Sequence, residues 1–227
     1  MCSSAFSQSL QNNEKNTVQV FHRMSPFVVN VHQVKQVPLN FWRSQAIATG
    51  AGSGFIWNSE GYVVTNYHVV ENASKLAVTM HDGKTVYARL VGVDRRRDIA
   101  VLKLDDLSVL PAQVKKQQYF KLSESRTLQV GQEAIAIGSP YGLSNTLTEG
   151  VVSAVNRKVV GQDLGISADL VQTDASINPG NSGGPLLNSE GDLIGMNTII
   201  YSSNGGSNGI GFAVPSNAID SAVTQII

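Results

Sequence analysis

Short apolar and β-branched runs, closely spaced along the chain, most constrain what this sequence can fold into. About a dozen such runs lie between Phe27 and Val214, each bounded by Gly, Asn, Asp, Ser or Pro. Runs of this length between turn-forming residues are typical of β-strands, and strands do not alternate with helical patterns as a parallel α/β fold requires. The sequence therefore predicts an all-β protein built from two sheets or barrels.

Two segments depart from the strand pattern. Residues 17–24 predict a short helix, which ends before Pro26 because the residue preceding a proline disfavours helical geometry. Near the other end, apolar residues recur at helical spacing after Pro215, and Ser216 is the candidate N-cap. We expect a flexible N-terminal arm over 1–16, a first β-barrel over 17–115, and a second barrel with a closing helix over 116–227.

Composition excludes several classes of protein. The chain has 227 residues, 42% of them hydrophobic, which excludes disorder as the main state. Its 17 Lys and Arg balance its 17 Asp and Glu, so the basic surface of a nucleic-acid binder is missing. No apolar run approaches the ~18 residues of a membrane helix, and no signal peptide is visible. We expect no cofactor, no metal, no nucleic-acid partner and no integral membrane segment.

The single cysteine, Cys2, excludes an intrachain disulfide. Three interpretations remain open for it: an incidental terminal residue, a lipid anchor at a mature N-terminus, or a reactive thiol. The run of Arg95, Arg96 and Arg97 is also open, as a solvated turn, a surface ion pair or a substrate-docking element.

A serine among glycines is the strongest chemical signal. In the segment from Gly180 to Gly184 (GNSGG), glycines allow a sharp turn and the close approach of a substrate carbonyl to Ser182. The backbone N–H groups of Gly180 and Ser182 could converge on a developing oxyanion. The pattern is compatible with acyl transfer by a nucleophilic serine, and also with a plain glycine-rich turn between strands.

Chain order separates the possible serine hydrolases. The four histidines, His22, His32, His68 and His81, all precede Ser182, which excludes the α/β-hydrolase order. No Asp precedes the last histidine, which excludes the subtilisin order. Only the order His, Asp, Ser remains, and this is the order of the all-β chymotrypsin type.

Position along the predicted strands selects the partners. His68 ends an apolar run that starts at Tyr62, whereas the other three histidines lie near the N-terminus or in a polar turn. Asp98 directly precedes the apolar run from Ile99, where one partner can shield a carboxylate from water. Its rivals are Asp94, Asp105 and Asp106, which lie in polar, charge-rich segments.

Taken together, these motifs resemble the HtrA (Deg) family of serine proteases over roughly residues 17–227. The matching segments are Gly52–Phe55 (GSGF), Thr65–Val70 (TNYHVV), Asp98–Leu104 (DIAVLKL), Ala136–Gly142 (AIGSPYG), Gln172–Ala175 (QTDA), Gly180–Leu186 (GNSGGPL) and Gly209–Pro215 (GIGFAVP). They occur in the family's order and spacing. Most HtrA proteins carry PDZ domains after the protease, and none is present in these 227 residues.

The resemblance implies a trypsin-like double β-barrel in which His68 is the general base, Asp98 orients it and Ser182 is the nucleophile. Gly180, Asn181 and Ser182 would form the oxyanion hole, with two backbone donors and Asn181 shaping the loop. The segment Pro38–Thr49 takes the place of the family's variable early loop and is short. Trimerisation through the N-terminal segment is expected, with 18–24 as the packing helix.

The resemblance also suggests a substrate class. Trypsin-like enzymes that cleave after Arg or Lys carry an Asp six residues before the nucleophile, and here that residue is Ser176. Ile177, Ile210 and Phe212 would line an apolar pocket, which favours cleavage after small or medium aliphatic residues. Unfolded or damaged proteins are the expected substrates, in a periplasmic, secreted or organelle-lumen setting. A chaperone-like or regulatory homologue with little general proteolysis is the alternative.

Overall fold

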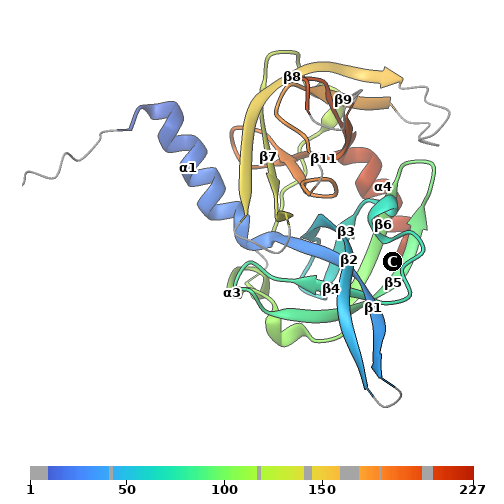
Figure 1. Cartoon of the computed structure of the whole chain (residues 1–227). Helices are drawn as coiled ribbons and strands as arrows, with labels where there is room; N and C mark the ends of the chain where they lie inside the picture. Colours follow the sequence, from blue (N-terminus) through green and yellow to red (C-terminus); the bar gives the residue numbers. More distant parts are fainter. Residues whose placement is uncertain are drawn as a thin grey trace, which may run out of the picture.

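The computed structural model describes residues 10–40, 43–116, 119–140, 145–158, 169–178, 180–200 and 207–227. Two closed antiparallel barrels make up most of it (Figure 1). The predicted all-β double barrel is therefore confirmed. The first barrel closes in the order β1-β2-β3-β6-β5-β4 and the second in the order β10-β11-β12-β9-β8-β7.

The strands of the first barrel are β1 (Val28–Asn40), β2 (Arg43–Ile56), β3 (Tyr62–Thr65), β4 (Leu76–Thr79), β5 (Thr85–Asp94) and β6 (Ile99–Leu104). Those of the second are β7 (Glu133–Gly138), β8 (Thr146–Lys158), β9 (Asp169–Thr173), β10 (Pro185–Leu187), β11 (Leu193–Ile200) and β12 (Gly211–Pro215). The helices are α1 (Asn12–Met24), α2 (Tyr67–Val70), α3 (Ala112–Lys115) and α4 (Ser216–Ile226), with 3-10 turns η1 (Ser25–Phe27), η2 (Leu107–Val109) and η3 (Ser125–Thr127). The predicted boundary at residue 115 stays a prediction.

Apolar residues fill both barrels and join across their contact. The first barrel buries Phe55, Ile99 and Leu102 completely, and the second buries Ile135 and Leu187. All five belong to one continuous cluster of buried side chains. Because dense apolar packing resists displacement, this shared core holds the two barrels at a fixed distance.

The hairpin of β1 and β2 is longer than predicted. The strands pair from Val28 opposite Phe55 to Asn40 opposite Arg43, with bulges near Gln33 and Pro38. Most of the predicted loop at 38–49 is therefore strand. Paired strands satisfy each other's backbone groups whatever side chains they carry, so a segment of mixed polarity extends the ladder without an apolar pattern to reveal it.

The N-terminal helix starts at Asn12, five residues before the predicted start, so residues 12–16 do not belong to a flexible arm. The cause is a capping box between Gln11 and Glu14, in which the Gln11 backbone N–H donates to Glu14 Oε2 at 2.6 Å. The helix lies against the second barrel (Figure 1). Thr17 Oγ1 donates to the Glu149 carboxylate of β8, and the Arg23 guanidinium donates to the Glu190 carbonyl.

The C-terminal helix α4 contacts the first barrel. Ile226 of α4 lies so close to Gly92 of β5 that a side-chain Cβ on this glycine would come within 2.8 Å of it. Pro215, not Ser216, is the N-cap, and the Ser216 hydroxyl instead donates to the Ser123 carbonyl at 2.6 Å. Each terminal helix thus braces the barrel that is more distant in sequence.

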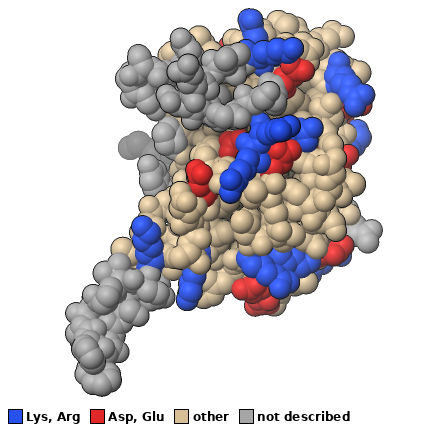
Figure 2. All heavy atoms as spheres, turned by 90° about the vertical axis from the view of Figure 1, so that its right-hand side faces the viewer, with Lys and Arg blue, Asp and Glu red and all other residues tan. Residues whose placement is uncertain are grey.

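The surface mixes charges of both signs. On the face in Figure 2, Lys and Arg side chains lie beside Asp and Glu. Ion pairs of this kind join Arg97 to Asp94 at 3.0 Å and Lys121 to Asp192 at 2.9 Å. Within the described residues, no helix is long and apolar enough to cross a bilayer, and no three His, Cys, Asp or Glu side chains gather as metal ligands.

Because His32 on β1 is half-buried, we expect the folded chain to lose stability as the pH falls. Desolvation lowers the pKa of His32 from its ordinary value of 6.5, so the folded chain binds this proton less readily than the unfolded chain. Its contribution to stability is complete above about pH 6.5 and is lost as the pH falls through the window below that value. We expect His32→Gln to reduce the loss of unfolding free energy between about pH 7.5 and about pH 5, measured by urea denaturation. His22→Gln, on the exposed side of α1, is the control, and equal pH dependence in wild type and His32→Gln would contradict the prediction.

Candidate functional site

Three separate elements carry the predicted catalytic residues. His68 lies on the one-turn helix α2, which follows β3 soon after this strand ends at Thr65, as the strand pattern predicted. Asp98 directly precedes β6, as expected, and Ser182 lies in the turn between β9 and β10. The first two belong to one barrel and the third to the other, so the site is assembled only where the barrels meet.

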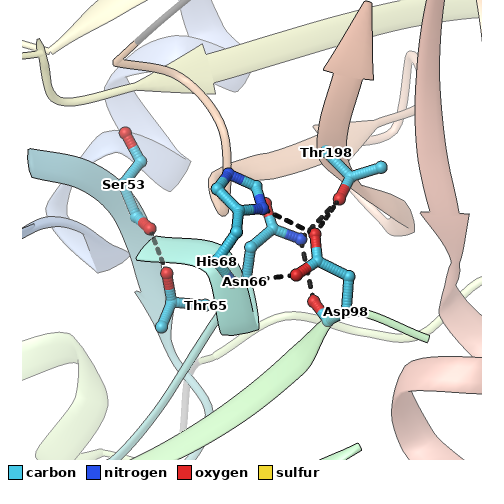
Figure 3. A network of polar contacts seen from close by, with 6 residues as sticks. All are labelled: Ser53, Thr65, Asn66, His68, Asp98 and Thr198. Atoms are coloured by element: carbon cyan, nitrogen blue, oxygen red, sulfur yellow. Dashed lines mark hydrogen bonds and ion pairs between the residues drawn. The ribbon is translucent and has the colours of Figure 1, made fainter. Parts of the chain in front are cut away.

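His68 and Asp98 form a closely matched pair (Figure 3). The His68 ring contacts Asp98 Oδ2 through Nδ1 at 2.7 Å, and the His68 backbone N–H donates to Asp98 Oδ1 at 2.9 Å. The Asp98 side chain is 8% exposed, whereas that of His68 is 44% exposed. Both carboxylate oxygens therefore contact His68, whose side chain remains partly open to solvent.

A tight turn places Asp98 for this contact. Asp98 has a φ of 56°, an unusual value for a residue other than glycine. The Asp94 carboxylate accepts from the backbone N–H groups of Arg96 and Arg97 at 3.1 and 3.2 Å, and so stabilises the turn. Of the interpretations left open for the arginines, the surface ion pair is realised by Arg97 with Asp94. Asp94 is thus a structural acid of this turn.

The other candidates do not approach the pair among the described contacts. Asp106 caps η2 by accepting from Ser108, and His32 contacts Asn30 through Nδ1 at 3.0 Å. His22 is on the exposed side of α1. The structure therefore brings together His68 and Asp98, the two residues selected by their position beside predicted strands.

Two polar residues that sequence reasoning missed complete the surroundings of Asp98. Thr198 Oγ1, from β11 of the second barrel, donates to Asp98 Oδ2 at 2.8 Å (Figure 3). Asn66 Nδ2 donates to the Asp98 carbonyl at 3.0 Å and to Thr198 Oγ1 at 2.6 Å. Asn66 lies two residues before His68 in the TNYHVV motif, so the sequence did offer a signal for it. No spacing in the sequence pointed to Thr198.

The loop that carries Ser182 packs directly on the first barrel. Gly183 has a φ of 85°, and a Cβ on it would collide with the Ser53 carbonyl and reach the Asn66 backbone nitrogen at 3.2 Å. Only glycine allows this approach. A Cβ on Gly52 would likewise meet Val69, the neighbour of His68, and the Ser182 carbonyl. These contacts place Ser182 beside the segment that holds His68; its hydroxyl has no hydrogen-bond partner among the described residues.

Ser53 fixes the backbone on both sides of the Ser182 turn. Its backbone N–H donates to the Ser182 carbonyl at 2.8 Å, and its hydroxyl donates to the Gly180 carbonyl at 2.6 Å. The same hydroxyl accepts from the Ser139 N–H at 2.8 Å, and Ser53 is fully buried. One serine of the first barrel therefore bonds to three backbone groups of the second.

Asn181 organises the rest of the loop. Its Nδ2 donates to the Ser176 carbonyl at 3.0 Å, and its Oδ1 accepts from the Asn178 N–H at 3.0 Å. No described residue accepts a hydrogen bond from the backbone N–H of Gly180 or Ser182. The loop is thus held through its carbonyls, through the Asn181 side chain and through the Gly183 N–H, which donates to the Asn197 carbonyl at 2.7 Å.

The predicted pocket residues differ in their surroundings. Ile177 is buried in the core of the second barrel and faces Gly211, whereas Phe212 is buried in the larger shared cluster. Ile210 is half-buried and packs against that same cluster. Ile210 and Phe212 are the chain neighbours of Gly211, and Ile177 lies against this glycine from another segment. The role of the three as a substrate pocket remains a prediction.

The three predicted catalytic residues lie within the part of the chain that matches a known protein family. The family described as trypsin-like peptidase domain matches residues 52–196, which include His68, Asp98 and Ser182. The chain belongs to the trypsin-like peptidase family. Its match to that family runs across both barrels and includes the Ser53 and Asn66 segments as well.

More specific relatives are HtrA-type proteases. This trypsin-like peptidase is 43% identical over 223 residues to protease Do-like 1, chloroplastic, of Arabidopsis thaliana, covering 97% of this chain and 49% of the relative. It is 46% identical over 179 residues to the periplasmic pH-dependent serine endoprotease DegQ of Escherichia coli, covering 78% of this chain and 37% of that protein. Among solved structures, the HtrA-type protease AlgW with decapeptide matches at a TM-score of 0.81 and 36% identity, covering 92% of this chain and 67% of that one.

These matches confirm the resemblance to the HtrA (Deg) family and support the predicted enzyme class, a serine-type endopeptidase. The chain spans about half or less of the length of the curated relatives named here. Their similarity to this trypsin-like peptidase therefore concerns the protease domain.

The bonds of Ser53 predict a measurable contribution to folding. Ser53→Ala would leave the buried Gly180 carbonyl and Ser139 N–H without their partner, and an unsatisfied buried polar group costs roughly 1–3 kcal/mol. We expect the free energy of unfolding in urea to fall by about 2 kcal/mol. Ser74→Ala, which removes one long bond from an exposed serine to Val34, is the matched control. A Ser53→Ala variant as stable as that control would contradict the prediction.

Proposed function

We propose that this chain is the protease domain of an HtrA-type endopeptidase that degrades unfolded or damaged proteins through an acyl-enzyme, cleaving after small or medium aliphatic residues. One observation carries the proposal: Asp98 accepts hydrogen bonds from both the backbone and the Nδ1 position of His68. An ionised carboxylate can only accept, so this contact places the ring proton on Nδ1 and leaves Nε2 as the free base.

His68 then acts as the general base. Its Nε2 takes the proton of the Ser182 hydroxyl as Ser182 Oγ attacks the peptide carbonyl, and Asp98 stabilises the imidazolium that forms. The imidazolium returns the proton to the leaving amine, and water later hydrolyses the acyl-enzyme by the same route. Catalytic hydrogen bonds often tighten only when substrate is bound, which is compatible with a Ser182 hydroxyl that has no hydrogen-bond partner among the described residues.

The oxyanion that develops on the substrate carbonyl is assigned to the backbone N–H groups of Gly180 and Ser182. The absence of a described acceptor for either group supports this role, and Asn181 shapes the turn between them. Each such donor is worth about 2.7–4 kcal/mol of transition-state stabilisation. Ser53 contributes indirectly, because it fixes the carbonyls of the same two residues.

Aliphatic specificity is inferred from the residues near the serine loop. Ser176, at the position where an acid would pair with a basic substrate side chain, uses its carbonyl to accept from Thr148 and Asn181. The apolar side chains of Ile177, Ile210 and Phe212 flank the same region. A lysine buried there would be an unpaired charge, which is strongly disfavoured.

Assembly and location are inferred from the relatives and from α1. Leu10 and Val18 on or beside this helix are exposed apolar residues, which supports packing of α1 in a homotrimer or higher oligomer. DegQ is described as periplasmic and protease Do-like 1 as chloroplastic, so a periplasm or organelle lumen is the proposed setting.

Removal of the nucleophile tests the proposal. We expect the wild-type chain to digest reduced casein and to react with a fluorophosphonate probe, and Ser182→Ala to lose both, with turnover lower by about 10⁴-fold or more. Ser189→Ala, an exposed serine in the turn after β10, is the matched control and should keep full activity. Wild type that neither cleaves nor labels would favour the chaperone-like alternative.

The cleavage sites test specificity separately. Two peptides that differ only in Val or Lys before the scissile bond should differ in kcat/KM by on the order of 100-fold in favour of Val, because the lysine would be desolvated without a partner. Mapping of casein fragments by mass spectrometry should show cuts after Val, Ala or Ile. A strict preference for Arg or Lys would contradict the predicted pocket.

A further inference from the structure

Asn66 joins the two barrels through the residue that orients the catalytic histidine. We propose that Asn66 is a positioning residue, which directs the Thr198 hydroxyl proton onto Asp98 Oδ2 and thereby sets the charge that His68 experiences. This inference rests on the proposed function of His68 and Asp98. Its starting point is a closed set of hydrogen bonds among Asn66, Asp98 and Thr198 (Figure 3).

The Asp98 carbonyl fixes the orientation of the Asn66 amide. A backbone carbonyl can only accept, so the group that faces it at 3.0 Å must be the Nδ2 amide, not Oδ1. Rotation of the amide by 180° would bring two oxygens together at this distance. The side-chain NH2 is thereby also placed 2.6 Å from Thr198 Oγ1.

The Asn66 amide in turn fixes the Thr198 hydroxyl. Since NH2 is a donor, Thr198 Oγ1 must accept from it, and the single hydroxyl proton of Thr198 is left for another acceptor. Asp98 Oδ2, at 2.8 Å, is that acceptor. The direction of each bond therefore follows from the one before it, and the sequence of bonds ends on the carboxylate oxygen that faces His68 Nδ1.

Donation to Oδ2 affects His68 electrostatically. A donor on this oxygen offsets part of its negative charge, so it lowers the attraction between Asp98 and a protonated imidazole. Without Asn66, the Thr198 hydroxyl would be free to rotate, and a buried hydroxyl with several rotamers holds the carboxylate less firmly. All three residues are nearly inaccessible to water, with exposures of 0% for Asn66, 2% for Thr198 and 5% for Asp98, so no solvent proton replaces the lost donor.

The unsatisfied atom of Asn66 supports a donor role. Its Oδ1 is buried and has no hydrogen-bond partner among the described residues. Burying an amide oxygen without a partner is unfavourable, and an aliphatic side chain of similar size would avoid this cost. The two N–H donations are what an aliphatic residue would lack.

The first test measures His68 directly in the Ser182→Ala chain, where catalysis is absent. The NMR titration of the His68 ring is compared in this parent and after adding Asn66→Ala, Thr198→Val or Thr198→Ser. We expect both Asn66→Ala and Thr198→Val to move the midpoint to higher pH, because Thr198→Val removes the donor to Asp98 Oδ2 and Asn66→Ala leaves the direction of that donor unfixed. Thr198→Ser retains a hydroxyl and should titrate like the parent.

The second test uses the active chain. Asn66→Ala should lower kcat by about tenfold or more with KM within about twofold, and should shift the acid limb of kcat/KM to higher pH. The double variant with Thr198→Val should behave like Asn66→Ala alone, because both changes interrupt one path. Independent losses that multiply would overturn the proposal.

Asn145→Ala is the matched control. Asn145 is also a buried asparagine that donates through Nδ2, here to the Ser25 carbonyl. Among the described residues its Oδ1 has no partner, and none of its hydrogen bonds involves Asn66, Asp98 or Thr198. It should lower thermal stability without moving the His68 titration. If folded Asn66→Ala titrates like this control, Asn66 is merely structural and the proposal fails.

The two tests distinguish failure of the Asn66 proposal from failure of the proposed function. If Asn66→Ala does not fold, the difference between Thr198→Val and Thr198→Ser decides, and identical titration of these two overturns the proposal. If wild type cleaves no peptide, the proposed function fails, but the His68 titration in the Ser182→Ala chain still supports or overturns the role of Asn66.

Discussion

Buried hydrogen bonds between the two barrels are the constraint on which the rest of this structure depends. Ser53 lies where β2 passes the Ser182 turn, and it is fully buried. Its groups can be satisfied only by Gly180, Ser139 and Ser182 of the other barrel and by Thr65 of its own. A shift of the barrels by little more than an ångström would leave several of these groups unpaired, at a cost comparable to a large part of the stability of a domain.

Because of this constraint, the relative position of the two barrels depends more on close backbone contacts than on the volume of the side chains between them. Gly52 and Gly183 stand at close backbone contacts between the two barrels, and Gly183 has both a left-handed backbone and no room for a Cβ. The terminal helices act in the same direction, because α1 bonds to the second barrel and α4 packs on the first. The apolar core then supplies most of the driving force, while the polar contacts fix the relative position.

Sequence reasoning found the parts of the site that are set by local pattern. Asp98 was predicted because it precedes a buried strand, and chain order limited the possible hydrolase types. The family resemblance was confirmed by the match to the trypsin-like peptidase family and by the HtrA-type relatives, while the role of Ser182 stays a prediction. Each of these features is defined by a few residues that are neighbours in the sequence.

The features that sequence reasoning missed depend on contacts between distant segments. Thr198 is 100 residues from Asp98 in the chain, and no spacing rule relates them. The one-turn helix at His68 and the long β1–β2 hairpin arise because tertiary contacts override a weak local preference. The earlier start of α1 is different, since Gln11 and Glu14 form a capping box of the less common kind that begins with glutamine.

Because the site is divided between the barrels, its parts are synthesised at different times. A ribosome makes His68 and Asp98 well before it makes Ser182, and Thr198 follows later still. Until the second barrel emerges and docks, the growing chain carries the His68–Asp98 pair without Ser182 and without Thr198, which donates to Asp98 in the folded chain. The two parts of the site therefore come together only when the second barrel has folded against the first.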